Sequence, residues 1–194
     1  APAASEASLV VGEKLSGTAY VFGNGDIFTS STSSGARASI TNSLGTGWFV
    51  GGSGAVSRDT TEHQLLLGDQ GAESSTGSTY YGALYVIDAP VFGPYDAATD
   101  ASFTIYADNK AKLGASLSSG DVNGDGVDDV LIGAPNDGSF DKGRASLFYG
   151  PFTEPTGVVS LSDADAYLEG TDANDFAGLR VESAGDLNCD GVPD

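Results

Sequence analysis

The sequence predicts an all-β fold made of repeated sheets of short antiparallel strands. Runs rich in β-branched and aromatic residues alternate with clusters of Gly, Asp, Asn and Ser, a pattern typical of strands joined by hairpin turns. No long stretch has the periodicity of an amphipathic helix. Related runs also return at a nearly constant spacing. These three observations together indicate a β repeat protein.

Two sets of apolar runs define the repeat. Runs that begin with Gly and continue into aromatic or β-branched residues return at nearly equal intervals, starting at Gly17, Gly82 and Gly143. A second set, three apolar residues followed by Gly, recurs with a similar spacing and has its glycines at Gly12, Gly68 and Gly133. A repeat of roughly 40 to 65 residues that holds four short strands has the size of one β-propeller blade. The sequence therefore predicts propeller blades of four antiparallel strands.

The strands divide the chain into four units, residues 1–44, 45–112, 113–175 and 176–194. We expect strands at 9–11, 18–22 and 38–41, at 47–51, 64–67, 83–87 and 102–106, at 114–118, 130–132, 144–149 and 166–169, and at 179–183. Three strands in the first unit and one in the last sum to one further blade, about three blade equivalents in all. Propellers usually have roughly four to eight blades. We therefore expect a fragment of a longer protein, or one component of a propeller completed by another chain.

Oxygen-bearing side chains recur at alternate positions between the strands expected at 114–118 and 130–132. Calcium takes roughly six to eight oxygen ligands. Gly124 and Gly126 allow the backbone to curl around an ion. The predicted ligands are the side chains of Asp121, Asn123, Asp125 and Asp129 and the backbone carbonyl of Val127.

The same pattern returns one repeat later, at the end of the chain. Turns that bind no ion are the alternative, because Asp, Asn and Gly also dominate ordinary turns. Two copies in register favour calcium. An EF-hand is not expected, since its loop needs Glu at position twelve, where this sequence has Ile132. The second set of predicted ligands is Asp186, Asn188, Asp190, Val192 and Asp194.

Composition narrows the classes of partner. The chain of 194 residues has 8 Lys and Arg against 27 Asp and Glu, a formal net charge of −19. Nucleic acids and anionic membranes reward clustered positive charge, so neither is expected as a partner. No apolar run is long enough to span a membrane. The small residues at 1–5 resemble a mature end left by signal-peptide removal, although an engineered chain start would look the same.

The third unit resembles the FG-GAP repeat of integrin α-subunit propellers and of many exported bacterial proteins. Leu113-Gly114 stands where the family has Phe-Gly, residues 121–129 match its calcium loop, and Gly133-Ala134-Pro135 matches its Gly-Ala-Pro. In the last unit Phe176-Ala177-Gly178 approximates Phe-Gly, and residues 186–194 match the loop. The resemblance implies a seven-bladed propeller with calcium held between the first and second strands of certain blades. Residues 45–112 form a degenerate copy, and no calcium is expected at 54–62.

Other chemistry finds little support in the sequence. His63 is the only histidine, and no serine lies in a G-x-S-x-G elbow, so no hydrolase triad is predicted. Cys189 is the only cysteine and is expected as a free thiol, with an intermolecular disulfide as the alternative. Trp48 is expected to pack in the core or between blades.

The function expected from these features is structural. We expect a secreted, extracellular or cell-surface calcium-binding module that acts in adhesion or protein interaction and has no catalytic residues. Two alternatives stay open at this point. Open strand edges could instead assemble copies of the chain into a ring or filament. The chain could also be the non-catalytic propeller part of a larger secreted enzyme.

Overall fold

In the computed structural model of this protein, nearly all of the regular secondary structure is β-strand. It describes residues 9–13, 17–22, 36–43, 55–57, 63–73, 82–88, 92–107, 109–152 and 158–194. Within these residues thirteen strands form three sheets, and the helical elements are α1 (Ala97–Asp100) and one 3-10 helix (Leu161–Asp163). The predicted all-β fold class is confirmed.

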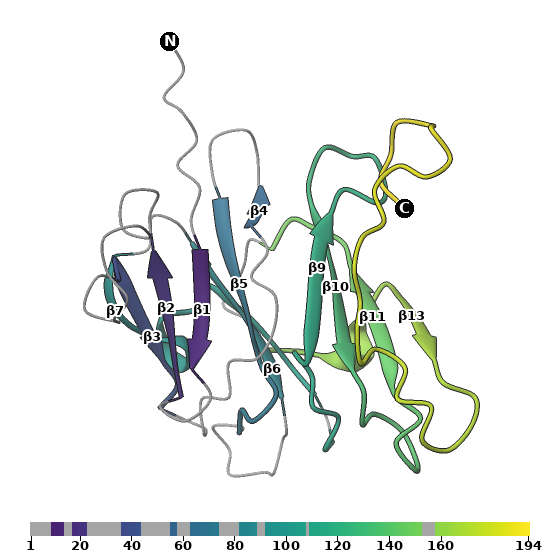
Figure 1. Cartoon of the computed structure of the whole chain (residues 1–194), viewed down its shortest axis with the longest axis horizontal. Coiled ribbons are helices and arrows are strands. Elements are labelled where there is room, and N and C mark those ends of the chain that lie inside the picture. The colour runs from purple at the N-terminus through teal and green to yellow at the C-terminus, as the bar shows by residue number, and fades with distance from the viewer. Residues whose placement is uncertain are drawn as a thin grey trace.

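The three sheets lie side by side (Figure 1). The first sheet contains, in spatial order, β1 (Leu9–Glu13), β2 (Thr18–Phe22), β3 (Ala38–Thr41) and β7 (Gly93–Asp96). The second contains β4 (Ala55–Ser57), β5 (His63–Asp69), β6 (Ala83–Asp88), β8 (Phe103–Tyr106) and β12 (Val158–Ser160). The third contains β9 (Ser116–Gly120), β10 (Asp129–Ala134), β11 (Arg144–Phe148) and β13 (Ala166–Glu169). Strands β4, β5, β6 and β8, and likewise β9, β10, β11 and β13, pair antiparallel in chain order, which is the arrangement of a propeller blade.

The second sheet is buried on both faces. Side chains alternate between the two faces of a strand, so neighbours in sequence enter different cores. Leu66, Leu84 and Val86 belong to the core shared with the third sheet. Leu67, Tyr85 and Ile87 belong to the core shared with the first sheet. Burial on both faces explains why β5 and β6 are nearly continuous apolar runs.

Glycines bring the backbones of the second and third sheets into contact with the start of the unit that follows each of them in the chain. Gly68 in β5 lies against Gly114, and Gly133 in β10 lies against Gly178, so that a Cβ on Gly68 or Gly133 would overlap the partner's carbonyl oxygen. Gly114 and Gly178 have φ values of 86° and 80°, a left-handed conformation that suits Gly. The start of each of these two units therefore docks on the second strand of the unit before it.

The strands expected at 18–22, 38–41 and 166–169 have those bounds in the structure. β9 begins at Ser116, two residues later than expected, because the backbone at Leu113 and Gly114 contacts the second sheet instead. The strand expected at 47–51 lies outside the described residues.

Two further strand predictions are wrong. The segment 179–183 forms no strand, because none of the described strands pairs with it; Ser183 N–H donates instead to Ser118 Oγ at 3.0 Å. Conversely, the sequence predicts only a degenerate loop at 54–62, but β4 lies within these residues. β4 pairs antiparallel with β5, with Val56 opposite Gln64, so this part of the chain supplies a first strand.

β7 and β12 have no counterpart in the prediction. Each belongs to the connection between the third and fourth strands of a blade, and each is followed by a short helical turn. β7 pairs parallel with β3 of the first sheet, and β12 pairs parallel with β8 of the second. We call residues 93–102 the first strap and residues 158–165 the second strap, because each connects its own blade to the preceding sheet.

Candidate metal centre

The loop between β9 and β10 carries the first set of predicted ligands. Asp121 Oδ1 accepts the N–H of Asp125 at 3.0 Å, and Asp121 Oδ2 accepts the N–H of Gly126 at 2.8 Å. Asn123 Oδ1 also accepts the Asp125 N–H, at 2.9 Å. Gly124 and Gly126 have φ values of 75° and 89°, which allow the chain to reverse around these side chains. Three predicted ligands therefore belong to one tight turn.

The last side chain of this set, Asp129, is held by the blade itself. It is 1% exposed at the start of β10. Asp129 Oδ1 accepts the N–H of Gly150 at 3.0 Å, and Oδ2 accepts the N–H of Val122 at 3.0 Å. Burial raises the pKa of Asp129 above its usual range, although these two hydrogen bonds act in the opposite direction. Burial therefore disfavours the ionised form of Asp129, and a nearby cation would stabilise that form.

The terminal loop repeats the same hydrogen bonds. Asp186 Oδ1 and Oδ2 accept the N–H groups of Asp190 and Gly191 at 3.1 and 2.9 Å. Asn188 Oδ1 accepts the Asp190 N–H at 2.8 Å. Asp194 Oδ2 accepts the Leu187 N–H at 2.7 Å, as Asp129 Oδ2 does from Val122. The two loops therefore share these backbone-to-side-chain hydrogen bonds, although Asn123 Nδ2 donates to Asp125 Oδ2 and Asn188 Nδ2 donates to Asp194 Oδ1.

The donor set of each loop suits calcium by its chemistry. Three carboxylates, one side-chain amide and one backbone carbonyl provide only oxygen atoms, which hard cations prefer. Their arrangement is not that of a closed metal cluster: within the residues described above, no three or more His, Cys, Asp or Glu side chains are grouped to hold a metal ion. Carboxylates of both loops accept backbone N–H groups of their own turn. The structure thus places the predicted ligands in one turn of each loop without gathering their carboxylates at one point.

The two loops lie against each other. A Cβ on Gly124 would lie 3.2 Å from Val192 Cγ2. Below this contact, a cavity of about 270 Å³ separates the third sheet from the terminal segment. Asp129 and Asp194, the last predicted ligand of each loop, both line it, together with the exposed Glu182. The two predicted sites therefore belong to one region of the molecule.

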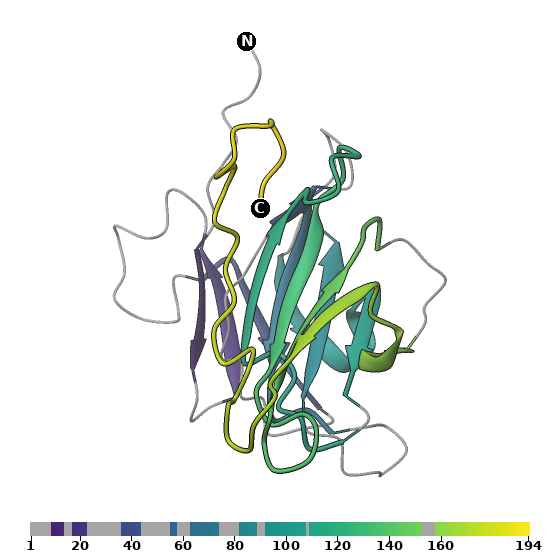
Figure 2. The same ribbon diagram turned by 90° about the vertical axis from the view of Figure 1, so that its right-hand side faces the viewer.

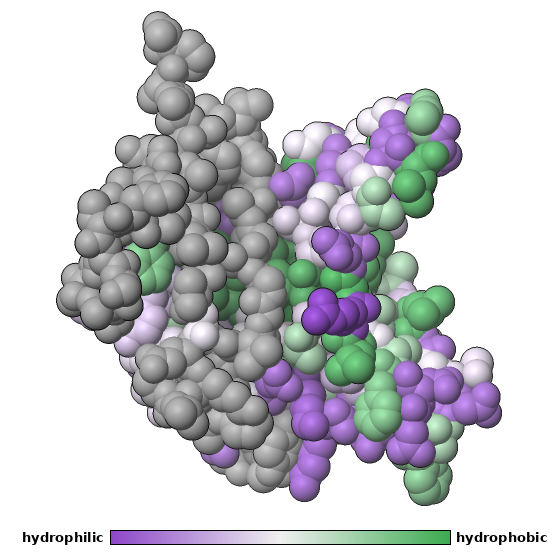
Figure 3. Space-filling view, in the orientation of Figure 1, coloured by the Kyte–Doolittle hydropathy of each residue, from purple (hydrophilic) through white to green (hydrophobic). Residues whose placement is uncertain are grey.

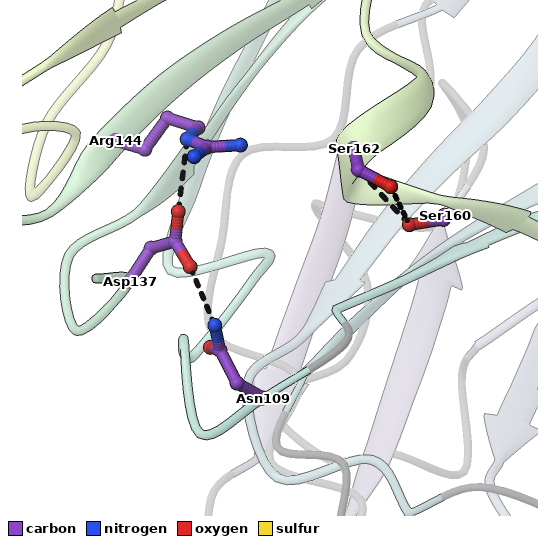
Figure 4. Close-up of polar contacts among 5 residues, drawn as sticks. All are labelled: Asn109, Asp137, Arg144, Ser160 and Ser162. Atoms are coloured by element: carbon purple, nitrogen blue, oxygen red, sulfur yellow. Dashed lines mark hydrogen bonds and ion pairs between the residues drawn. The ribbon is translucent and has the colours of Figure 1, made fainter. Parts of the chain in front are cut away.

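A second polar group lies in the connection from β10 to β11, at the other end of the third sheet. Asp137 is buried and accepts Asn109 Nδ2–H at 2.9 Å, while Arg144 Nε lies 2.8 Å from its other carboxylate oxygen (Figure 4). Arg144 also lies over the ring of Tyr167, 4.6 Å from its centroid. A cavity of about 1030 Å³ adjoins this group and is lined by Gln70, Glu73, Lys110, Lys112, Asn136 and Asp141, among others.

The sequence reasoning also missed a buried polar group between the first two sheets. Asn42 Nδ2 donates to Asp69 Oδ2 at 2.9 Å and to Tyr85 Oη at 3.0 Å. Asp69 is fully buried. Burial is the largest of the effects that raise the pKa of Tyr85, and the neighbouring Tyr106 and Asp69 raise it further. The sequence did contain a signal for this group, because Asp69 ends an apolar run at the position where the third blade has Ala134. A buried Asp at such a position needs hydrogen-bond partners.

The remaining candidates are not among the predicted metal ligands. Cys189 is an exposed free thiol with a φ of 63°, at the loop position where the first loop has Gly124. His63 is the first residue of β5. Trp48 lies outside the described residues.

Comparisons with known proteins point to one family. Residues 113–148 match the family model of the FG-GAP repeat. Integrin alpha-PS2 of Drosophila melanogaster is 37% identical over 90 residues, which cover 42% of this chain and 6% of that protein. The matched part is thus a small fraction of the integrin chain. None of the helices in the described residues is long and apolar enough to cross a membrane.

Proposed function

We propose that this chain, which carries an FG-GAP repeat of the integrin α type, is a calcium-stabilised β-propeller segment acting as an extracellular interaction or adhesion module without catalysis. The observation that carries the calcium proposal is the repeated loop. Two segments one repeat apart have the same oxygen donors and the same side-chain to backbone hydrogen bonds. A turn that served only to reverse the chain would not need this donor set twice.

The loops are prepared for an ion by their own hydrogen bonds. A carboxylate oxygen that accepts one N–H keeps another lone pair for a further partner. Calcium would be held in the first loop by the side chains of Asp121, Asn123, Asp125 and Asp129 and by the Val127 carbonyl. In the second loop it would be held by the matching residues within 186–194. Bound calcium supplies the positive charge that offsets repulsion among these side chains. Because the backbone of the turn already has its shape, binding would require the carboxylates to draw together but little reordering of the main chain.

The role of the ion would be structural. The first loop joins β9 to β10, and Asp129 connects the loop to the end of β11 through Gly150. Fixing the loop therefore fixes the edge of the third sheet and the terminal segment packed against it. A ligand that binds only the folded state at 100 times its dissociation constant adds about 2.7 kcal/mol to the free energy of unfolding.

Calorimetry and thermal melting test the proposal. Saturating calcium should raise the melting temperature over that in chelator by about 5 to 10 °C, given the usual temperature dependence for domains of this size. Asp125→Ala should remove the part of that shift that the first loop contributes. Glu182→Ala, which deletes an exposed acid near the same loops and changes the net charge equally, should retain it. A melt that is the same in calcium and in chelator would contradict the proposal.

A further inference from the structure

The two straps lie in equivalent places. In the first strap, β7 runs parallel to β3 and places Tyr95 opposite Ile40. In the second, β12 runs parallel to β8 and places Val159 opposite Ile105. Both β3 and β8 are the outermost antiparallel strand of their sheet. The same connection in two successive blades thus extends back to the outer edge of the blade before it.

Both straps end their strand in a capped helical turn. In the first strap, Asp96 Oδ1 accepts the Ala98 N–H at 3.0 Å, and the Asp96 N–H donates to Asp100 Oδ2 at 2.8 Å. In the second, Ser160 Oγ accepts the Ser162 N–H at 3.0 Å (Figure 4), and the Ser160 N–H donates to Asp163 Oδ2 at 3.1 Å. These are reciprocal caps of the kind that fix the entry to a helix.

The turns then return the chain to its own blade in the same way. The first helical residue is buried in both cases, Ala97 at 0% and Leu161 at 2% exposure. The chain next bonds to the third strand: Ser102 N–H donates to the Val86 carbonyl at 2.8 Å, and Asp165 N–H donates to the Leu147 carbonyl at 3.0 Å. Equivalent bonds at both ends make the straps one repeated element.

Within the part of the chain that the structure describes, the third sheet has the acceptor edge without a strap. The registers place Ile40, Ile105 and Leu168 at the same position of β3, β8 and β13. Ile40 and Ile105 are 0% exposed, whereas Leu168 is 69% exposed. β13 is the end strand of its sheet, on the right in Figure 1 and nearest the viewer in Figure 2. Apolar residues remain at the surface on this side of the molecule (Figure 3).

We propose that the outer edge of β13 is a docking site for a third strap, contributed by a further blade of the same type. The occupant is an extended segment of three or four residues, parallel to β13, followed by a capped helical turn. The basis is continuity with the two interfaces already formed at β3 and β8. The proposal goes beyond the calcium-stabilised module and does not depend on it.

The residues of β13 set the chemistry of the occupant. Tyr95 and Val159 lie opposite Ile40 and Ile105, so an apolar residue should lie opposite Leu168. The capping residue of each strap lies opposite the last residue of the outer strand, which in β13 is Glu169. Because a carboxylate there would repel Glu169, a neutral Ser, Thr or Asn cap is favoured over Asp. The second strap, with Ser160, is therefore the better model of the occupant.

The test attaches a copy of the second strap to the full chain. Residues 158–165 are fused after residue 194 through a flexible linker of about 30 Gly and Ser residues, which gives an effective concentration on the order of millimolar. Hydrogen exchange of the β13 amides is then followed by mass spectrometry, in calcium and in chelator. The fused strap should slow exchange in β13 by roughly tenfold in both conditions.

Changes in the fused copy test the pairing. A Val159→Asp change in that copy, which places a charge opposite Leu168, should abolish the protection. A Ser160→Asp change should weaken it, and Glu169→Gln in β13 should restore it. Unchanged exchange in β13 with the fused strap, or equal protection by the Val159→Asp copy, would overturn the proposal. A melt unaffected by calcium together with a protected β13 would reject the calcium proposal alone.

Discussion

The two predicted calcium loops share the hydrogen bonds from backbone N–H groups to their first Asp and their Asn, but they differ in how their last carboxylate is held. Asp129 is 1% exposed and is bonded by Gly150 from beyond the end of β11. Asp194 is exposed, and its side-chain carboxylate accepts hydrogen bonds from Leu187 and Asn188 of its own loop. The shape of the loop is therefore a local property of the Asp, Asn and Gly spacing, whereas its attachment to the blade depends on tertiary structure.

A second difference lies at the residue after the Asn. The first loop has Gly124 with a φ of 75°, and the second has Cys189 with a φ of 63°. Both positions need the left-handed conformation, which a side chain resists. The second loop keeps its hydrogen bonds in spite of this unfavourable residue, so those bonds compensate for its conformational cost.

Removing the last carboxylate of each loop should give the largest difference between the two loops in the free energy of unfolding. Asp129→Ala leaves the partly buried N–H groups of Gly150 and Val122 without their acceptor and should lower the free energy of unfolding by about 2 kcal/mol. Asp194→Ala exposes its donors to water and should cost less than about 1 kcal/mol. Urea denaturation of the full chain in chelator measures both. Equal losses in the two variants would show that the attachment of Asp129 to the blade adds nothing.

Substitution of the residue that follows the Asn, Gly124 or Cys189, should change the free energy of unfolding less than removal of Asp129 does. Gly124→Ala places a Cβ in the left-handed conformation and 3.2 Å from Val192 Cγ2, and should lower the free energy of unfolding by about 1 to 2 kcal/mol. Cys189→Gly relieves the same conformation and should raise it by about 0.5 kcal/mol, since the gain is offset by the entropy of Gly in the unfolded chain. The test is that the two substitutions change stability in opposite directions, which thermal melts in chelator can measure. A loss of stability in Cys189→Gly would mean that the thiol makes a contact that the loop needs.

The blade repeat and both loops could be predicted from sequence because their signals are local. Loop 121–129 is defined by residue types at fixed spacing, and β2, β3 and β13 are short β-rich runs bounded by turn residues. A strand's existence was harder to predict where it depends on a partner. Residues 179–183 are as apolar at alternate positions as other first strands, but nothing in the described chain pairs with them.

The straps could not be predicted because their pairing is non-local. Gly93-Pro94-Tyr95-Asp96 is short and contains Pro, which favours an edge or a loop in any single-sequence assignment. Its partner β3 lies in another blade, far away along the chain. The buried Asn42, Asp69 and Tyr85 share this difficulty, since they come together only when the first two sheets pack. Comparing the repeats position by position would have identified Asp69 as the exception.

The smallest expected difference between the loops is in their response to pH. The pKa of Asp129 is raised by burial, so the folded, metal-free protein binds its proton more tightly than the unfolded chain does. This contribution to stability is present at low pH and is lost as pH rises from the ordinary pKa of Asp through the raised pKa of the folded state. In chelator, Asp129→Asn should remove that part of the pH dependence of unfolding, whereas Asp194→Asn retains Asp129 and should keep it. Calcium should reverse the preference, because a cation favours the ionised carboxylate. If the parent and Asp129→Asn have parallel stability curves from pH 3 to 7 in chelator, burial of Asp129 has no energetic consequence, and the contrast between the two loops reduces to their hydrogen bonds alone.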